Sequence, residues 1–318
     1  MREKILDLLK RKTNYISGDF LAQRLGISRQ ALWKHIQDLK ELGYDIVAVP
    51  HLGYRLQATP DRLFDCEVSR NLNTRILGRK IYYFESITST MDAAMELGIK
   101  GAPEGSVVIA EAQTRGRGRL GRVWFSPKYK GIYFSVILRP KLAPANISIL
   151  TLLAAVSVVE AVKKIAGVDT EIKWPNDILL ENKKLGGILT ELNAEMDKVN
   201  FVIIGIGLNV NNDKRFLPSG AISLKEKSAQ ETSRIELLQE ILRRLETNYF
   251  ILGHKGSKAI IERWREYAIT LHRRVKVYCQ GQYIEGEVVN IDTDGGLLVR
   301  KDSGVIQKIF SGDLIHCS

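Results

Sequence analysis

Cysteine is scarce in this sequence of 318 residues. Cys66, Cys279 and Cys317 lie far apart and form no C-x-x-C pair. Such an odd and sparse set of thiols argues against a disulfide framework and favours a reducing compartment. The N-terminal stretch MREKILDLLKRK is charged throughout and lacks the apolar segment of a signal peptide. We therefore expect a cytoplasmic protein.

Long hydrophobic runs are also few. The most apolar run, ISILTLLAAVSVVEAV at residues 147–162, is broken by Glu160 and followed by Lys163 and Lys164. We expect this run to be too short to span a bilayer and to form a buried helix instead. No association with a membrane is expected.

Several catalytic signatures are missing. The sequence contains neither a G-x-x-x-x-G-K-[ST] phosphate loop nor a G-x-S-x-G nucleophile elbow. GIGLNV has the first two glycines of a dinucleotide fingerprint, but Val210 stands in place of the third, so we reject that match. The histidines do not pair with cysteines or carboxylates at the spacing of metal ligands, and the adjacent His316 and Cys317 do not make a zinc site.

Positive charge is in excess. The sequence has 47 lysines and arginines against 36 acidic residues, a formal net charge of +11. This excess favours polyanionic partners such as nucleotides, nucleic acid or an acidic protein surface, with solubility as the alternative reason for it. The length favours two or three domains, and a hydrophobic content of 45% is typical of a globular protein with a core.

Residues 1–60 have the pattern of three helices followed by a hairpin. SGDFLAQRLG opens on a capping serine and closes on Gly26, and SRQALWKHIQDLKELG runs from the capping Ser28 to Gly43. YDIVAVPHLGYRL alternates like two strands that turn near His51-Leu52-Gly53. This order is that of a winged helix-turn-helix.

In a winged helix-turn-helix the second helix of the motif enters the major groove of DNA. Residues 1–60 carry ten basic against six acidic residues, which mildly favours DNA. A small helical module for protein contacts is the alternative. The side chains expected to contact DNA are Ser28, Arg29, Gln30, Trp33, Lys34 and Gln37.

The remaining chain predicts two further domains. Residues 61–268 mix strand patterns with helices expected at 89–98, 147–166, 234–252 and 257–267. Because strand patterns outnumber helices and neighbour one another, we expect an α/β (α+β) domain with a mixed sheet. Residues 269–318 alternate in short runs, with tight turns at Asp294-Gly295-Gly296 and Asp302-Ser303-Gly304, and predict a small all-β barrel.

The stretch QTRGRGRLGRVWFSP places four arginines and three glycines between Arg115 and Arg122. Glycine lets backbone N–H groups approach an anion, and guanidinium groups offer forked donors to carboxylate and phosphate oxygens. Repulsion between the arginines on a flexible backbone predicts a loop that is disordered when empty and ordered by an anionic ligand. An RNA contact or a solvated loop remains open.

Two other stretches could carry chemistry. In KWPNDILLENKKLGGILTE, a strand is interrupted at Trp174-Pro175, so that Asn176 and Asp177 lie at a bend near two lysines, where a metal and a triphosphate could bind. A hairpin with a charged turn is the alternative. In ESITSTMDAAMELG, Ser89 and Thr90 stand where a strand becomes a helix, and capping of the helix is favoured over ligand binding.

Taken together, STMDAA, GRGRLGRVWFSP, KWPNDILL, KLGGILTE and GIGLNVN resemble the biotin–protein ligases in order and spacing from Phe84 to Asn211. The N-terminal winged helix-turn-helix and a C-terminal SH3-like β-barrel extend the resemblance to the whole chain, in the form that also represses biotin genes. It implies that biotin and ATP, with Mg²⁺, form biotinyl-5′-AMP, and that biotin passes to a lysine in the carrier domain of acetyl-CoA carboxylase or a related carboxylase. No permanently bound cofactor is expected.

The resemblance also implies roles for single residues. Lys184, Arg119 and Asp177 would be catalytic, with Asp177 as the Mg²⁺ ligand and the nearest candidate for a base. Biotin would contact Ser89, Thr90, Gln113, Arg117, Gly118, Arg119, Lys184 and Gly187. The nucleotide would contact Arg119, Arg122, Trp124, Asn176, Asp177 and Asn209.

The sequence departs from the family at two positions. Leu120 stands where some members carry another arginine, and Ala221 stands where a bulky aromatic side chain sometimes covers the adenine. The role of position 120 and the tightness of adenine binding are therefore open.

Three rival functions can be weighed. A lipoate–protein ligase shares the catalytic fold but carries an R-R-x-x-G-G-G-type motif that is absent here. A DNA-binding biotin sensor without catalysis would not need Lys184, Asp177 and Arg119, and an RNA-binding protein leaves KWPND unexplained. Since helix-turn-helix proteins usually bind operator DNA as two-fold dimers, we expect a ligand-promoted homodimer with biotinyl-AMP as co-repressor.

Overall fold

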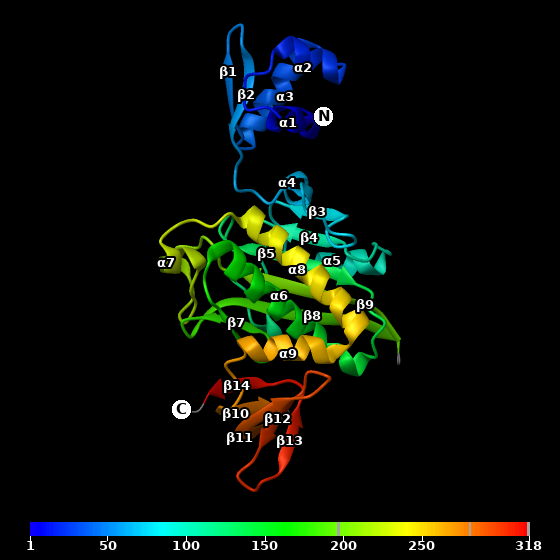
Figure 1. Ribbon diagram of the computed structural model, residues 1–318, viewed down its shortest axis with the longest axis vertical. Coiled ribbons are helices and arrows are strands. Elements are labelled where there is room, and N and C mark those ends of the chain that lie inside the picture. The colour runs from blue at the N-terminus through cyan, green and yellow to red at the C-terminus, as the bar shows by residue number, and fades with distance from the viewer. Residues whose placement is uncertain (196–197, 280, 317–318) are drawn as a thin grey trace. The chain divides into compact units, whose positions relative to one another are not determined.

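The computed structural model describes residues 1–195, 198–279 and 281–316, and its internal contacts separate two compact units, Met1–Arg62 and Leu63–Ser318 (Figure 1). Cys66 and Cys279 are not joined in a disulfide, as expected, while Cys317 lies outside the described residues.

The first unit has the predicted order of elements: α1 (Arg2–Lys10), α2 (Gly18–Leu25), α3 (Arg29–Glu41), β1 (Asp45–Val49) and β2 (Gly53–Ala58). Ser17 Oγ accepts a hydrogen bond from the N–H of Phe20 at 3.4 Å, and Ser28 Oγ accepts one from the N–H of Ala31 at 3.1 Å. Both serines therefore cap their helices as predicted. Gly26 ends α2 at a φ of 66°, a left-handed conformation that favours glycine.

The second unit is built on a sheet in the order β3-β4-β5-β9-β8-β7-β6. Only β3 and β4 pair in parallel among these described strands, so the sheet is mixed as predicted. Its strands are β3 (Ile81–Phe84), β4 (Val107–Ala110), β5 (Ile132–Leu138), β6 (Glu171–Lys173), β7 (Asp177–Leu180), β8 (Lys183–Glu195) and β9 (Lys198–Leu208).

Helices cover both faces of this sheet. Side chains alternate along a strand, so Val108, Ile137 and Ile203 pack against α5 (Thr90–Ile99). The opposite face joins a larger core with α6 (Ser148–Ala166), α8 (Arg234–Lys255) and α9 (Ser257–Tyr267) (Figure 1). The remaining helices are α4 (Asp65–Ser69) and α7 (Leu224–Ser228), with short 3₁₀ turns at Arg119–Gly121, Pro144–Asn146 and Lys214–Phe216.

Helix α8 is longer than the sequence predicts. We expected it to end at Leu252, before Gly253, but it continues to Lys255 and stops at Gly256. A single glycine costs only about 1 kcal/mol relative to alanine in a helix, so Gly253 does not by itself end α8. Gly256, with a φ of 73°, follows the last helical residue.

Helix α6 corrects one expectation about length. The stretch Pro144–Ala166, 23 residues, is long and apolar enough to cross a membrane by length and composition alone, so our argument that the run is too short was wrong. The prediction of a buried helix is confirmed, because its residues lie in the core between the sheet and α8 and α9. A core helix passes the same test of length and composition as a membrane helix.

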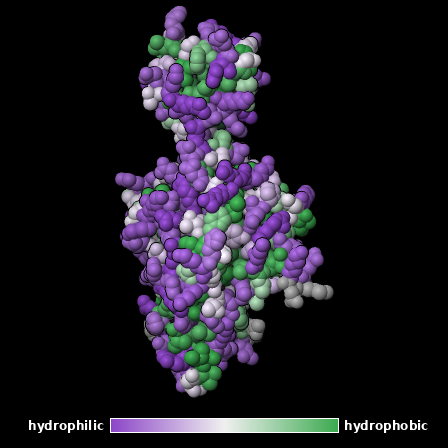
Figure 2. Space-filling model, turned by 45° about the vertical axis from the view of Figure 1, so that its right-hand side comes forward, coloured by the Kyte–Doolittle hydropathy of each residue, from purple (hydrophilic) through white to green (hydrophobic). Residues whose placement is uncertain are grey.

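The C-terminal part of the second unit is an antiparallel sheet in the order β13-β12-β11-β10-β14. Its strands are β10 (Arg274–Cys279), β11 (Gln282–Ile291), β12 (Leu297–Arg300), β13 (Ile306–Ile309) and β14 (Asp313–His316). The sequence did not predict β14. Figure 2 shows apolar residues gathered on the surface of this part, and Ile306, Phe310 and Ile315 are among its exposed side chains.

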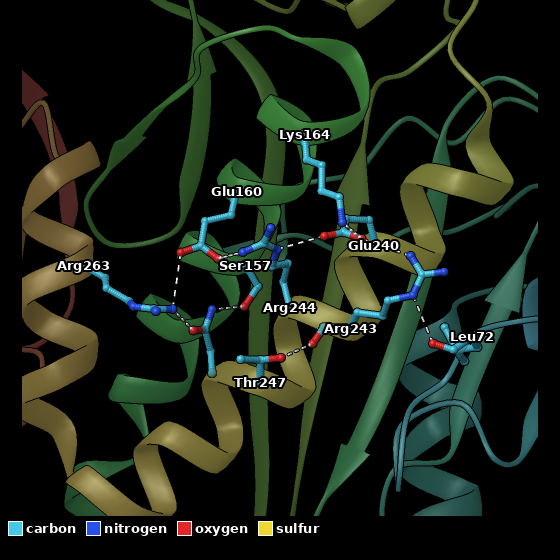
Figure 3. A network of polar contacts seen from close by, with 10 residues as sticks. Leu72, Ser157, Glu160, Lys164, Glu240, Arg243, Arg244, Thr247 and Arg263 are labelled. Carbon is cyan, nitrogen blue, oxygen red and sulfur yellow. Dashed lines mark hydrogen bonds and ion pairs between the residues drawn. The ribbon is translucent and has the colours of Figure 1, made fainter.

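A polar network joins α6, α8 and α9 inside the second unit (Figure 3). The buried Glu240 carboxylate accepts hydrogen bonds from Lys164 at 2.9 Å, Arg243 at 3.0 Å and Arg244 at 2.9 Å. Burial raises the pKa of this carboxyl, but the three hydrogen bonds outweigh burial and hold the pKa below its ordinary value. Glu240 therefore remains charged in the folded protein near neutral pH.

We predict that Glu240→Gln lowers the free energy of unfolding at pH 7 by about 1–3 kcal/mol, since removing one partner leaves three cations without their common carboxylate. Because the pKa of Glu240 is lower in the folded protein, this contribution is fully present above the unfolded pKa and is lost as the pH falls through the folded pKa. Urea unfolding would measure both effects. Glu262→Gln, at an exposed position of α9, is the control, and an equal loss in both variants would contradict the prediction.

Candidate functional site

A cavity of about 520 Å³ opens in the second unit. Its walls come from the start of α5, the arginine loop (Arg115–Trp124), the bend between β6 and β7, strands β8 and β9, and the segments 218–221 and 312–315. The predicted ligand-binding residues in its lining are Thr90, Gln113, Arg117, Gly118, Arg119, Arg122, Trp124, Asn176, Asp177, Lys184, Gly187 and Asn209. Residues far apart in the sequence thus meet in one place.

Glycines form the floor of the cavity. On β9, Ile204 and Ile206 face the core beneath α6, whereas the alternate residues Gly205 and Gly207 face the cavity. A Cβ at Gly207 would lie 2.4 Å from Nε1 of Trp124. The GIGLNV stretch therefore provides close packing beneath a ligand site, which agrees with our rejection of a dinucleotide fingerprint.

One end of the cavity is a chain of neutral hydrogen bonds. The N–H and Oγ1 of Thr90 donate to Oε1 of Gln113 at 2.8 and 3.2 Å, and Ser135 Oγ donates to Thr90 Oγ1 at 2.9 Å. Nε2 of Gln113 donates to Ser126 Oγ at 3.0 Å. These side chains are held in fixed orientations and suit a small polar, uncharged group.

Ser89 differs from its neighbours. It precedes the first residue of α5 but makes no capping hydrogen bond, so the capping interpretation favoured from the sequence was wrong. Its side chain is fully buried, and its Oγ has no hydrogen-bond partner among the described residues. A buried hydroxyl without a partner costs about 1–3 kcal/mol, which a nearby acceptor would recover. Ser89 itself does not line the cavity.

The arginine loop is folded. The N–H of Gly118 donates to the carbonyl of Arg122 at 2.7 Å, and the N–H of Trp124 donates to the carbonyl of Gly116 at 2.8 Å. Leu120 lies at the tip of the loop, with a φ of 55° and a side chain that is 72% exposed. It does not line the cavity. Ordering of this loop by a ligand remains a prediction.

Two arginines of this loop tie it to the cavity walls. Arg117 forms ion pairs with Asp92 of α5 at 2.8 Å and with Glu191 of β8 at 3.0 Å. Arg122 pairs with Asp313 of β14. These contacts join the loop to α5, β8 and β14, and the loop forms part of the cavity wall.

Arg119 lies deeper. Its guanidinium donates to Oδ1 of Asn176 at 3.1 Å and to the carbonyl of Gly312 at 3.3 Å. Burial lowers the pKa of Arg119, opposed by the charges of Asp313 and Asp177. An arginine remains protonated despite such a shift, so a fixed positive charge stands inside the cavity.

Lys184 and Asp177 are in contact, with Nζ 2.6 Å from Oδ1. The same ammonium lies 5.7 Å from the centre of the Trp124 ring. The backbone of Lys184 pairs with the segment that contains Ala221, whose small side chain lines the cavity. The position where the family sometimes has an aromatic cover is thus directly beside the catalytic candidates.

The donor set at Asp177 suits one kind of metal. No cluster of three or more histidine, cysteine or acidic side chains exists within residues 1–195, 198–279 and 281–316. Mg²⁺ keeps several waters and commonly binds through one or two carboxylates together with substrate phosphates. Asp177, which is partly exposed in the cavity, fits this requirement only in combination with a phosphate ligand.

The sequence reading missed some residues of the cavity. Gly312 precedes β14 and Asp313 is its first residue. This strand was not predicted, and nothing local in the sequence connects the two residues with the arginine loop. Lys173 also lines the cavity, although we had considered it only as the start of a strand. Its position directly before Trp174-Pro175, where the strand is interrupted, was the feature of the sequence that could have indicated a place in the site.

In the first unit, the buried stripe of α3 consists of Leu32, Ile36 and Leu39. Gln30, Lys34 and Gln37 lie on the opposite side, Arg29 and Trp33 lie on its flank, and Ser28 is the N-cap residue. Ser28, Arg29, Gln30, Trp33 and Lys34 are exposed, and Gln37 is partly buried. Arg29 lies 3.3 Å from the exposed Asp19 of α2, a contact that a phosphate could replace.

Comparison with known protein families finds a match for each of three segments of the chain. Residues 83–209 match the biotin/lipoate A/B protein ligase family, residues 1–55 a helix-turn-helix domain, and residues 270–316 the biotin protein ligase C-terminal domain. The chain is 39% identical to the bifunctional ligase/repressor BirA of Bacillus subtilis, over 99% of this chain and 98% of that protein. It is 31% identical to the protein of that name in Escherichia coli, over 94% and 92%.

Solved structures agree with this. The biotin protein ligase of Aquifex aeolicus in complex with biotin and ATP matches 75% of this chain and 99% of its own, with 31% identity and a TM-score of 0.66. The likeness in sequence extends over the full chain and over its helix-turn-helix, ligase and C-terminal segments. The chain therefore belongs to the bifunctional ligase/repressor members of the biotin protein ligase family.

Proposed function

We propose that this protein is a biotin–protein ligase that also acts as a DNA-binding repressor of biotin genes. The main support for the ligase activity is that one cavity contains both the neutral Thr90–Gln113 end and the charged side chains of Lys184, Asp177 and Arg119. The neutral end suits the uncharged ureido ring of biotin, and the charged end suits its carboxylate together with ATP.

In the first half-reaction a carboxylate oxygen of biotin attacks the α-phosphorus of ATP. The new bond joins that oxygen to phosphorus as the bond to the bridging oxygen breaks, and pyrophosphate leaves. Both reactants are anions, so their approach needs positive charge that is already in place. Lys184 and Arg119 supply this charge, held by Asp177 and Asn176 before the ligands arrive.

Mg²⁺ would neutralise further phosphate charge in this step. Asp177 would be its protein ligand, because the carboxylate faces the cavity beside Lys184. Arg122, Trp124, Asn176 and Asn209 would contact the nucleotide, and Asn209 is kept in place by donating to the carbonyl of Ile222 at 3.2 Å.

The second half-reaction transfers biotin to a lysine of the carrier domain of acetyl-CoA carboxylase or a related carboxylase. The lysine amine attacks the carbonyl carbon of the mixed anhydride, the bond to the phosphate oxygen breaks, and AMP leaves. The amine must lose a proton, and Asp177 is the proposed acceptor. The arginine loop, with Arg117 and Gly118 over the cavity, excludes the water that would hydrolyse the anhydride.

The repressor activity is assigned to the exposed side of α3. We propose that residues 1–60, 61–268 and 269–318 act as three domains, and that bound biotinyl-AMP favours a homodimer whose two copies of α3 read operator DNA. Closure of the arginine loop would couple the ligand to dimerisation. The protein would act in the cytoplasm, where its substrates and DNA are found.

We predict that the purified protein, with Mg²⁺, exchanges labelled pyrophosphate into ATP in the presence of biotin but not of lipoate or octanoate. Lys184→Met should lower the exchange rate by roughly 10²–10³-fold, because a preorganised charge at the reacting phosphate is lost. The matched control is Lys183→Met, since Lys183 is the exposed neighbour outside the cavity lining. Exchange with none of the three acids would leave a DNA-binding sensor as the better function.

We also predict that Lys34→Ala weakens binding to promoter DNA of the host's biotin genes, in the presence of biotin and ATP, by several-fold. The loss should be similar for all sequences and should reduce the slope of log affinity against log salt by about 1, as expected for one phosphate contact. Fluorescence anisotropy would measure it, with Lys4→Ala on the exposed side of α1 as control. Unchanged binding would remove Lys34 from the interface, and pyrophosphate exchange should be normal in both variants.

A further inference from the structure

Lys173 is a charged residue of the cavity that the proposed mechanism does not yet use. It is the last residue of β6, pairs with Asp177 across the β6–β7 hairpin, and is half-buried in the cavity wall. The next residue, Trp174, is fully buried: its backbone N–H donates to Thr270 Oγ1 at 3.1 Å and its indole N–H donates to the carbonyl of Gly295 at 3.3 Å. The backbone next to Lys173 is therefore held in place by the contacts of Trp174.

The other cations of the cavity already have partners within the protein. Arg117 pairs with Asp92 and Glu191, Arg119 donates to Asn176 and Gly312, Arg122 pairs with Asp313, and Lys184 pairs with Asp177. The Lys173 ammonium, by contrast, has no hydrogen-bond or ion-pair partner in the part of the chain that the structure describes. This ammonium is therefore available to an anionic ligand in the cavity.

The surroundings make this arrangement unfavourable without a ligand. Burial lowers the pKa of Lys173, and the positive charges of Lys184 and Arg122 add to that effect against the carboxylates of Asp177 and Asp313. A half-buried ammonium that lacks a hydrogen-bonding acceptor loses hydration without compensation. A bound anion would supply the acceptor and the opposite charge.

The neighbours of Lys173 indicate which anion this is. The charges that act on it belong to Asp177, Lys184, Asp313 and Arg122, all at the nucleotide end of the cavity rather than at the Thr90–Gln113 end. Lys184 and Arg119 are already assigned to the biotin carboxylate and the α-phosphate. The triphosphate carries further charge on its β- and γ-phosphates, for which no other free cation stands among the described lining residues.

We propose that Lys173 binds the β- and γ-phosphates of ATP and stabilises the pyrophosphate that leaves. This inference rests on the proposed adenylation of biotin and extends it to a substrate-contacting residue that serves only the first half-reaction. As the bond between the α-phosphorus and the bridging oxygen breaks, its electron pair stays on the pyrophosphate, and the Lys173 ammonium faces that added charge. Once pyrophosphate has left, Lys173 has no role in transfer from biotinyl-AMP.

The two half-reactions can be measured apart. Lys173→Met should lower kcat/KM for ATP in biotin-dependent pyrophosphate exchange by about 10- to 100-fold, the usual effect of losing one hydrogen bond to a charged group. It should weaken inhibition by added pyrophosphate to a similar degree. Transfer of biotin from synthetic biotinyl-5′-AMP to a carrier domain, and the Kd for biotin without ATP, should stay within about twofold of the wild type.

Two further variants sharpen the test. Lys173→Arg keeps the charge and should recover part of the exchange activity, while Lys183→Met, outside the cavity lining, should leave all four measurements unchanged. If Lys173→Met fails to fold, inhibition by added pyrophosphate is compared between Lys173→Arg and Lys173→Gln. We expect weaker inhibition than in the wild type only in the neutral variant, Lys173→Gln.

An equal loss of exchange and of transfer from biotinyl-AMP would overturn the inference, since Lys173 would then act on AMP or on the fold. Unchanged exchange in Lys173→Met would overturn it as well. Failure of the proposed function is recognised separately, because the wild-type protein would then show no biotin-dependent exchange at all.

Discussion

A ligand cavity in a tightly packed α/β layer needs a sheet face without side chains, and the glycines of β8 and β9 provide it. Helix α5 and the sheet fill the space on either side of this patch with apolar side chains. At Gly207 even a methyl group would collide with Trp124, and at Gly205 it would collide with Met91. The position of Trp124, the depth of the cavity and the access of Lys184 to a ligand all follow from these missing side chains.

Charge in this cavity is organised before any ligand arrives. Asp177 holds Lys184, Asn176 holds Arg119, and the acidic residues on the rim hold Arg117 and Arg122. Pairing keeps each cation in one orientation, so little reorganisation is needed when an anion binds. Lys173 departs from this pattern, because its ammonium has no partner among the described residues.

The C-terminal sheet takes part in the site rather than standing apart from it. The turn at Gly295 accepts the indole N–H of Trp174, and Gly312 and Asp313 accept hydrogen bonds from Arg119 and Arg122. Thus the KWPND bend and the arginine loop both depend on residues more than a hundred positions further along the chain. A substitution that distorts this sheet would therefore also displace Trp174 and Arg119 in the cavity, even if the residues that contact a ligand were unchanged.

The sequence by itself determined the features that depend on near neighbours. Capping by Ser17 and Ser28 and the helix end at Gly26 are set within a few residues, and the motif order was enough to identify the family. The tertiary structure alone decided the rest. Packing left Ser89 buried without a capping bond and brought β14 to the arginine loop. The reason is physical: a cap or a turn is a contact between adjacent residues, whereas the partner of a buried side chain is chosen by which distant segments meet.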